Sequence, residues 1–286
     1  MRIACHRRVT LHPLDLLLAL LGVAVGAFGT LVGAGGGFIL VPVLLLIYPD
    51  REPDQIVAIS LMVVFANSLS GTLAYARQGR VDWRSAGWFA LATFPGALGG
   101  ALVTSFIPRR VFDAGFGVLL MSLGLYLAIR KMRQDIIPPV TGWSVVQRDI
   151  RDREGLRYIY SYHMWKGMVA SAAIGFLSSL LGIGGGVIHV PVMATTLHFP
   201  VHIAAATSHA VLAFMSGEGT IVHFATGTLT WDRSLFQASM LAIGAVVGAQ
   251  IGARAARKLH GNLILRALAF ALMLLGLRLL LKAAGI

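Results

Sequence analysis

Residues Gly33-Ala34-Gly35-Gly36-Gly37 are followed by Phe38-Ile39-Leu40-Val41-Pro42, and the pattern returns as Gly182-Ile183-Gly184-Gly185-Gly186 followed by Val187-Ile188-His189-Val190-Pro191. Each copy interrupts an apolar run. Glycine is a poor helix former and adopts positive φ without steric cost. The sequence therefore predicts two breaks in otherwise helical segments, at corresponding places in two halves of the chain.

The composition is typical of an integral membrane protein. Hydrophobic residues make up 57% of the chain and charged residues 13%, with a mean hydropathy of +0.77, whereas charged residues approach about 25% in soluble domains. The formal net charge of +12 does not indicate nucleic-acid binding, because Lys and Arg lie between apolar runs. We therefore expect the lipid bilayer, and no nucleic acid, among the partners of this chain.

The apolar segments form two matching series. They cover residues 14–32, 38–48, 56–76, 85–107 and 111–130 in the first half, and 167–181, 187–198, 203–225, 234–255 and 262–282 in the second. A spanning helix needs about 20 residues, so the segments that follow the glycines are too short to cross alone. Pro42 and Pro191 lie inside them, where proline disfavours a regular helix. We read both as half-helices.

The two halves align beyond the glycines. Gly182 follows Gly33 by 149 positions, and Ser208 follows Ser60 by 148. Interrupted hydrophobic segments at corresponding positions of two halves indicate a transporter site near the bilayer midplane. We predict an all-α integral membrane protein of two homologous repeats, each a broken or re-entrant helix element plus three transmembrane helices. The first repeat covers 1–130, a cytoplasmic linker loop 131–166, and the second repeat 167–286.

Basic residues indicate the orientation. The polar stretch 131–166 and the loop 77–84 share a side of the membrane, and both are rich in Arg and Lys, which makes that side cytoplasmic. Re-entrant glycine elements would give inverted repeats with both termini outside, whereas crossing elements would give parallel repeats with both termini inside. Arg2, Arg7 and Arg8 favour the second arrangement and the shortness of 38–48 favours the first, which we prefer. We expect a multi-pass protein of the inner (plasma) membrane.

The glycine turns suit an anion. Unpaired N–H groups where a turn opens a helix form a donor array, and the helix dipole adds positive charge there. Ser60, Asn67, Ser68 and Ser208 would add neutral donors, although intramembrane hydroxyls also bond their own backbone or a neighbouring helix. The candidate substrate-binding residues are Gly33, Gly35, Gly36, Gly37, Pro42, Ser60, Asn67, Ser68, Gly182, Gly184, Gly185, Gly186, His189, Pro191, Thr207 and Ser208.

Ionisable residues at membrane depth are costly, by at least ~2.5 kcal/mol for a charge at the centre of a helix, so we weigh functional roles for them. Glu218 and His209 lie on one predicted helix and are candidates for proton coupling. Each also has a structural alternative, in which it bonds to a neighbouring helix. His189 lies within the second glycine element and either contacts an anion or is packed in the core.

Several motifs resemble the TauE/SafE sulfite exporter family. They are the doubled glycine pattern, Ala58-Ile59-Ser60, Ser68-Leu69-Ser70-Gly71-Thr72, Gly79-Arg80-Val81-Asp82-Trp83 and Pro95-Gly96-Ala97-Leu98-Gly99-Gly100. The resemblance covers nearly the whole chain except 131–166. It implies a carrier, not an enzyme, for a small sulfur-containing anion such as sulfite or an organosulfonate, with no catalytic residues and no cofactor. In the second half Met215 replaces Asn67 and Thr230 replaces Asp82. If Asn67 contacts the substrate, the pocket is asymmetric.

Two other functions were weighed. His189, His198, His202, His209 and His223 suggest divalent-metal transport, but no Asp or Cys joins them, and we expect no metal site. An intramembrane hydrolase would use Ser178 or Ser179 with His209 as base, but the sequence has no nucleophile elbow. We prefer a carrier that works by alternating access around an anion site where the two glycine elements meet. The sequence leaves open whether it forms a homo-oligomer.

Overall fold

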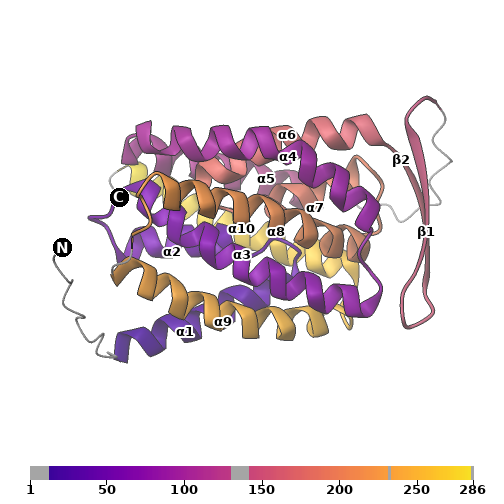
Figure 1. The fold of residues 1–286 in the computed structure, drawn as a ribbon, viewed down its shortest axis with the longest axis horizontal. Coiled ribbons are helices and arrows are strands. Elements are labelled where there is room, and N and C mark those ends of the chain that lie inside the picture. Colours follow the sequence, from indigo (N-terminus) through magenta and orange to yellow (C-terminus); the bar gives the residue numbers. More distant parts are fainter. Residues whose placement is uncertain (1–12, 130–141, 231–232, 285–286) are drawn as a thin grey trace, which may run out of the picture.

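The computed structural model describes residues 13–129, 142–230 and 233–284 of the 286-residue chain, and Arg2, Arg7 and Arg8 lie outside them. The described part is a bundle of long helices with one β-hairpin across an end (Figure 1). The elements are α1 (Pro13–Leu31), α2 (Gly37–Ile47), α3 (Pro53–Gln78), α4 (Trp83–Val103), a 3₁₀ turn (Thr104–Phe106), α5 (Arg109–Ile129), β1 (Val145–Arg151), β2 (Arg157–His163), α6 (Met164–Leu181), α7 (Gly186–Thr195), α8 (Val201–Ala225), α9 (Arg233–Ala256) and α10 (Gly261–Ala284).

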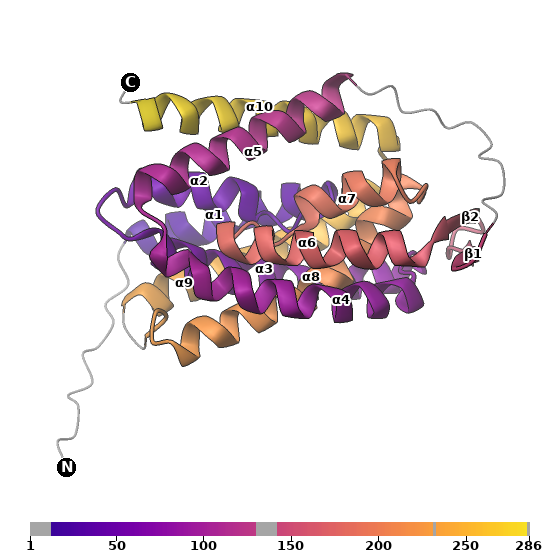
Figure 2. The same ribbon diagram turned by 90° about the horizontal axis from the view of Figure 1, so that it is seen from above.

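Both glycine stretches break the helix, as predicted. Gly33, Gly35 and Gly36 have φ of 79°, 73° and 89°, and Gly182, Gly184 and Gly185 have φ of 67°, 77° and 74°. These left-handed angles are strained for residues with a Cβ. After the first turn, α2 runs back toward the end from which α1 came, and α7 likewise returns toward the β-hairpin (Figure 2). Neither short helix crosses the bundle.

Six helices of the described residues are long and apolar enough to span a membrane. They are α3, α4 with its 3₁₀ turn, α5, α6, α9 and α10. Helix α8 has 25 residues but is more polar, since His209, Ser216 and Glu218 lower its hydropathy. The prediction of an all-α membrane protein is therefore confirmed for the helical part of the chain.

The helices pack in matched pairs. Helix α1 lies along α9, α4 along α6, and α5 along α10, while α3 and α8 contact each other inside the bundle. Small residues make the first two contacts close: Gly244 and Gly248 of α9 face backbone carbonyls of α1, and Gly96 and Gly100 of α4 face carbonyls of α6. Such small residues allow membrane helices to approach to backbone contact.

The region 131–166, which we read from the sequence as a loop, contains a β-hairpin. Strands β1 and β2 are antiparallel, with Val145 opposite His163 and Arg151 opposite Arg157. The hairpin lies across one end of the bundle, and the start of α1 and the end of α10 lie at the other (Figure 1). Of the 131–166 region, residues 131–141 lie outside the described part.

Buried ion pairs hold this hairpin to the α3–α4 connection. The Arg80 Nη2 atom lies 3.0 Å from Asp152 Oδ2, with side chains 3% and 0% exposed, and Arg148 Nε lies 3.0 Å from Asp82 Oδ2. Asp82 also accepts the Ser85 N–H at the start of α4 and the Tyr160 hydroxyl. Burial raises the pKa of Asp152, but hydrogen bonds from Arg80 and backbone amides outweigh it and hold that pKa below its ordinary value.

Candidate functional site: two glycine turns in the bundle

The two glycine turns contact each other through their backbones. A Cβ added to Gly37 would lie 2.7 Å from the carbonyl oxygen of Gly182, and a Cβ added to Gly186 would collide with the carbonyl oxygen of Gly33. Both contacts tolerate only glycine, because any Cβ would overlap backbone atoms. In this state the turns leave no room between these four residues, so a solute that reaches both turns must lie beside their contact or separate them.

Each turn presents the amino terminus of a short helix. The first backbone bonds of α2 run from the Ile39 and Leu40 amides to the Gly36 carbonyl, and those of α7 from Ile188 and His189 to the Gly185 carbonyl. Of the amides that precede these bonds, that of Gly186 donates to the Gly184 carbonyl at 2.9 Å; the others have no acceptor within their own helix, and the helix dipole is positive there. Two donor arrays suited to a negative charge therefore meet inside the bundle.

Two of the predicted site residues support the turns. Ser60 Oγ donates to the Gly182 carbonyl at 2.7 Å, and Asn67 Nδ2 donates to the Gly35 carbonyl at 3.0 Å. Both side chains come from α3 and are fully buried. Their donors are used on backbone carbonyls, so in this state they position the turns.

Four serine hydroxyls on helices that pack against the turns have no partner within the described part of the chain. Ser208 lies on the face of α8 whose Ala205 and Leu212 contact the first turn. Ser68, Ser178, Ser179 and Ser208 are fully buried, and the Oγ atom of each lacks a hydrogen bond. Ser68 Oγ lies 3.3 Å from the position of a Cβ on Gly35, and Ser178 Oγ lies 2.9 Å from that on Gly185. Buried hydroxyls are rarely left unbonded, so these atoms are available to a ligand.

Four predicted residues make other contacts or lie inside the short helices. Thr207 Oγ1 accepts the Asp82 N–H at 3.0 Å, next to the hairpin. His189 Nε2 lies 2.9 Å from Ser171 Oγ, and its ring centroid is 6.0 Å from that of Phe89. Pro42 is buried inside α2, and Pro191 is buried inside α7.

Comparison with known proteins identifies the family. Residues 18–279 match the family described as Sulfite exporter TauE/SafE. The chain belongs to the TauE/SafE family. It is 32% identical over 270 residues to the probable membrane transporter protein YunE of Bacillus subtilis, covering 92% of this chain and 96% of the relative. A probable membrane transporter protein of Methanocaldococcus jannaschii is 30% identical over 217 residues, 74% of this chain and 73% of the relative. No solved structure matches significantly.

The two candidate proton-coupling residues of this TauE/SafE transporter differ in their surroundings. His209 is fully buried, and its Nε2 atom lies 3.2 Å from Thr30 Oγ1, which in turn donates to Asn67 Oδ1 at 3.2 Å. Glu218 is partly buried, and its Oε1 atom has no partner among the described residues. Of the two, only His209 is linked to a glycine turn by hydrogen bonds among the described residues. Sequence reasoning missed Thr30, although Thr30 lies 149 positions before Ser179 and so could have been found from the repeat.

The side chains of the two other functional hypotheses are not brought together in the described part of this TauE/SafE chain. No three His, Cys, Asp or Glu side chains among the described residues are grouped as metal ligands. The ring nitrogens of His209 face Thr30 and the Ala205 carbonyl. Ser178 and Ser179 have no hydrogen-bond partner, so the serine–histidine pair that a hydrolase requires is not formed here.

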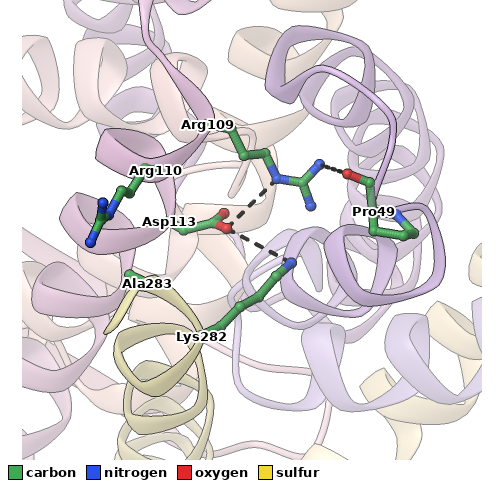
Figure 3. A pocket seen from close by; sticks show the side chains of 6 residues that line it. All are labelled: Pro49, Arg109, Arg110, Asp113, Lys282 and Ala283. Atoms are coloured by element: carbon green, nitrogen blue, oxygen red, sulfur yellow. Dashed lines mark hydrogen bonds and ion pairs between the residues drawn. The ribbon is translucent and has the colours of Figure 1, made fainter. Parts of the chain in front are cut away.

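A cavity of about 520 Å³ opens between the start of α5 and the end of α10 (Figure 3), which lie at the end of the bundle away from the hairpin (Figure 2). It is lined by Pro49, Arg109, Arg110, Asp113, Lys282 and Ala283. Arg109 Nη2 and Lys282 Nζ both donate to the Leu45 carbonyl near the end of α2, at 2.8 and 2.9 Å. Cations at a helix carboxyl terminus complement its dipole. In this TauE/SafE protein the outer end of α2 is therefore fixed by positive charge.

Proposed function

We propose that this chain is a carrier for a small sulfur-containing anion, such as sulfite or an organosulfonate. The observation that carries the proposal is the group of unpartnered buried hydroxyls beside two helix amino termini in the bundle. Neutral donors and helix dipoles bind oxyanions without a fixed counter-ion. Membership in a transporter family agrees with this reading.

We further propose that α1–α5 and α6–α10 are inverted repeats. The contact of α1 with α9 is matched by that of α6 with α4, and α3 contacts its own counterpart, α8. Single residues follow the same pattern: a Cβ on Gly71 would contact His209 and Thr30, while one on Gly219 would contact Leu61 and Ser179. These are corresponding positions of the two halves, so both halves use one packing plan.

Alternating access then follows from the opposed re-entrant helices. In such a carrier, one repeat rocks against the other around a fixed site near the midplane. At the hairpin end, Tyr160 and Tyr162 pack on Phe199 with ring centroids 4.5 and 4.8 Å apart. At the other end lies the basic cavity beside Arg110. We interpret the present state as closed toward the hairpin.

The orientation is inferred from charge. Arg77, Arg80, Arg84, Arg148 and Arg257 lie at or near the hairpin end, and Lys and Arg accumulate on the cytoplasmic side of membrane proteins. We therefore assign the hairpin to the cytoplasm and the start of α1 and the end of α10 to the opposite side of the inner membrane.

Counterflow in proteoliposomes tests the function. The panel of labelled solutes is sulfite, sulfoacetate, taurine and sulfate. Vesicles loaded with the unlabelled solute should take up labelled sulfite or one of the organosulfonates. Ser208→Ala should reduce the exchange by about tenfold or more, since a hydrogen bond to a charged group contributes about 1.5–3 kcal/mol. Because the Ser208 hydroxyl has no protein partner, the variant should remain folded.

Ser216→Ala is the matched control. Ser216 is equally buried on the same helix, but its hydroxyl donates to the Leu212 carbonyl of that helix. Its loss should change exchange by less than about threefold, the effect of a weak intrahelical bond. A wild-type protein that exchanges none of the four solutes of the panel would refute the proposed function.

A further inference from the structure

A line of hydrogen bonds joins one histidine to the first glycine turn. His209 Nε2 lies 3.2 Å from Thr30 Oγ1, Thr30 Oγ1 lies 3.2 Å from Asn67 Oδ1, and Asn67 Nδ2 lies 3.0 Å from the Gly35 carbonyl oxygen. The line crosses from α8 through α1 to α3. All three side chains are fully buried, so water does not interrupt it.

The number of protons in this line decides the charge of the histidine. His209 Nδ1 faces the Ala205 carbonyl at 3.3 Å, and a carbonyl only accepts, so Nδ1 carries hydrogen. A neutral ring then has an unprotonated Nε2, which takes the single hydroxyl proton of Thr30. Asn67 Oδ1 is left without a donor, because the Asn67 amide nitrogen is committed to Gly35.

Adding one proton to the ring resolves this conflict. With hydrogen on both nitrogens, His209 donates to Ala205 and to Thr30, and Thr30 can donate to Asn67. Every contact in the line then has one donor and one acceptor. The arrangement of oxygen atoms around His209 therefore matches an imidazolium.

The surroundings of the ring lack the negative charge that an imidazolium needs. Among the described residues, no carboxylate pairs with His209; its titratable neighbour is Tyr75 on α3, whose ring centroid is 5.6 Å away and whose hydroxyl donates to the Thr30 carbonyl. Dipoles alone compensate a buried charge poorly, whereas an anion at the turns would supply the opposite charge.

We propose that His209 is the proton-binding site of the carrier, and that it binds one proton together with each anion held at the glycine turns. This inference rests on the proposed anion transport and names its coupling ion. The second half has no equivalent site: Leu61, Met215 and Ser179 stand where His209, Asn67 and Thr30 stand in the first network. One proton site serves each chain.

The test uses purified full-length protein in proteoliposomes, with labelled sulfite as the probe. Two quantities are measured: counterflow at equal pH, and accumulation driven by an imposed pH gradient. Sulfite itself takes up a proton near neutral pH, so each variant is compared with wild type at identical pH values. With an acid exterior and an alkaline lumen, the wild type should accumulate sulfite inside the vesicles.

His209→Gln should lose at least tenfold of the gradient-driven accumulation when that accumulation is expressed relative to the counterflow of the same variant. Gln retains hydrogen-bonding capacity but binds no proton. Thr30→Val, which removes only the hydroxyl from the line, should weaken gradient-driven accumulation while counterflow persists. Elution as a single species in size-exclusion chromatography checks that each variant is folded, and Thr30→Val gives the second reading if His209→Gln is not.

The control is His202→Gln, a histidine in the first turn of the same helix that is only partly buried; it should behave as wild type. Gradient-driven accumulation that survives in His209→Gln, or that is lost in Glu218→Gln instead, would overturn the inference. Wild-type counterflow without any response to the gradient would also overturn it while leaving the anion carrier intact. Absence of wild-type counterflow would instead refute the proposed function itself.

Discussion

The two glycine turns have the same backbone but different supports. Both present left-handed glycines, a helix amino terminus and a glycine pressed against the opposite turn. The first turn is bound by Asn67, which continues through Thr30 to His209. Around the second turn the corresponding positions are Met215, Ser179 and Leu61. The shared part suits the binding of an anion, and the polar part is confined to one half.

The outer ends of the two short helices differ as well. Arg109 and Lys282 bond the Leu45 carbonyl at the end of α2. Beyond the end of α7, Phe199 instead packs against the tyrosines of the hairpin. One helix is therefore fixed by charge and the other by an aromatic cluster that belongs to a separate element.

The largest effect should come from filling the contact that both turns share. Gly186→Ala would place a methyl group against the Gly33 carbonyl and 2.7 Å from the Ala34 Cα atom, and Gly37→Ala would do the same to Gly182 and Ile183. Because backbone atoms cannot move aside cheaply, we expect anion exchange to fall by at least a hundredfold in both. Measurement of counterflow per folded protein checks this.

Gly87→Ala and Gly115→Ala provide the controls, because nothing lies within 4 Å of a Cβ at either site. Alanine also favours a helix over glycine, so both controls should be at least as stable as wild type. If Gly186→Ala kept more than a tenth of the exchange, the close approach of the turns would not matter for transport.

Arg80→Ala tests the anchor at the hairpin end. It leaves Asp152 buried without its main partner, and removal of one member of a buried pair costs about 3–5 kcal/mol. We expect the free energy of unfolding to fall by this amount, and we expect protease cleavage within 145–163. An unchanged pattern of limited proteolysis would show that the hairpin is held by other contacts.

The same ion pair predicts a pH dependence. The pKa of Asp152 lies below its ordinary value in the folded protein, so its contribution to stability is full above the unfolded pKa and is lost as the pH falls through the folded pKa. The stability difference between wild type and Asp152→Asn should therefore shrink as the pH is lowered below about 4. Thermal melts of both proteins across an acid pH series measure this difference.

Asn67→Met makes the first turn resemble the second. The Gly35 carbonyl loses its donor, and an unsatisfied buried polar group costs about 1–3 kcal/mol. Stability should fall by that amount, and gradient-driven transport should fall with it because the line to His209 is cut. The reverse exchange, Met215→Asn, adds an amide without the other members of the line, so it should leave proton dependence unchanged.

Sequence patterns predicted the features that depend on local chemistry. Long apolar runs located the helices, and doubled glycines located both breaks, because helix propensity and hydropathy act within a few residues. The hairpin was missed, although Tyr158, Tyr160 and Tyr162 recur at every second position, as residues on one face of a strand do. The charges of the surrounding stretch concealed this short alternation.

Features that depend on packing between distant segments were beyond reach. Ser60 and Asn67 were predicted to contact an anion, but their donors point to turn carbonyls 122 and 32 residues away along the chain. Thr30 and His209 are 179 residues apart and meet only because α1 packs near α8. Nothing local marks Arg109 as a ligand of the α2 carboxyl terminus, since an arginine at a helix end has many roles.

The smallest effect should come from the charge anchor of α2. Lys282→Met removes one of two donors to the Leu45 carbonyl, and a cation at a helix carboxyl terminus contributes about 0.3–1 kcal/mol. Arg109 retains its own bond to the same oxygen and its ion pair with Asp113, which Lys282 contacts at the longer distance of 3.8 Å, so stability should fall by no more than about 1 kcal/mol. Exchange should change less than threefold, because the turn itself is untouched. A loss as large as that of Arg80→Ala would mean that the two anchors are equivalent, and the contrast between a charge-fixed α2 and a hairpin-fixed α7 would then be wrong.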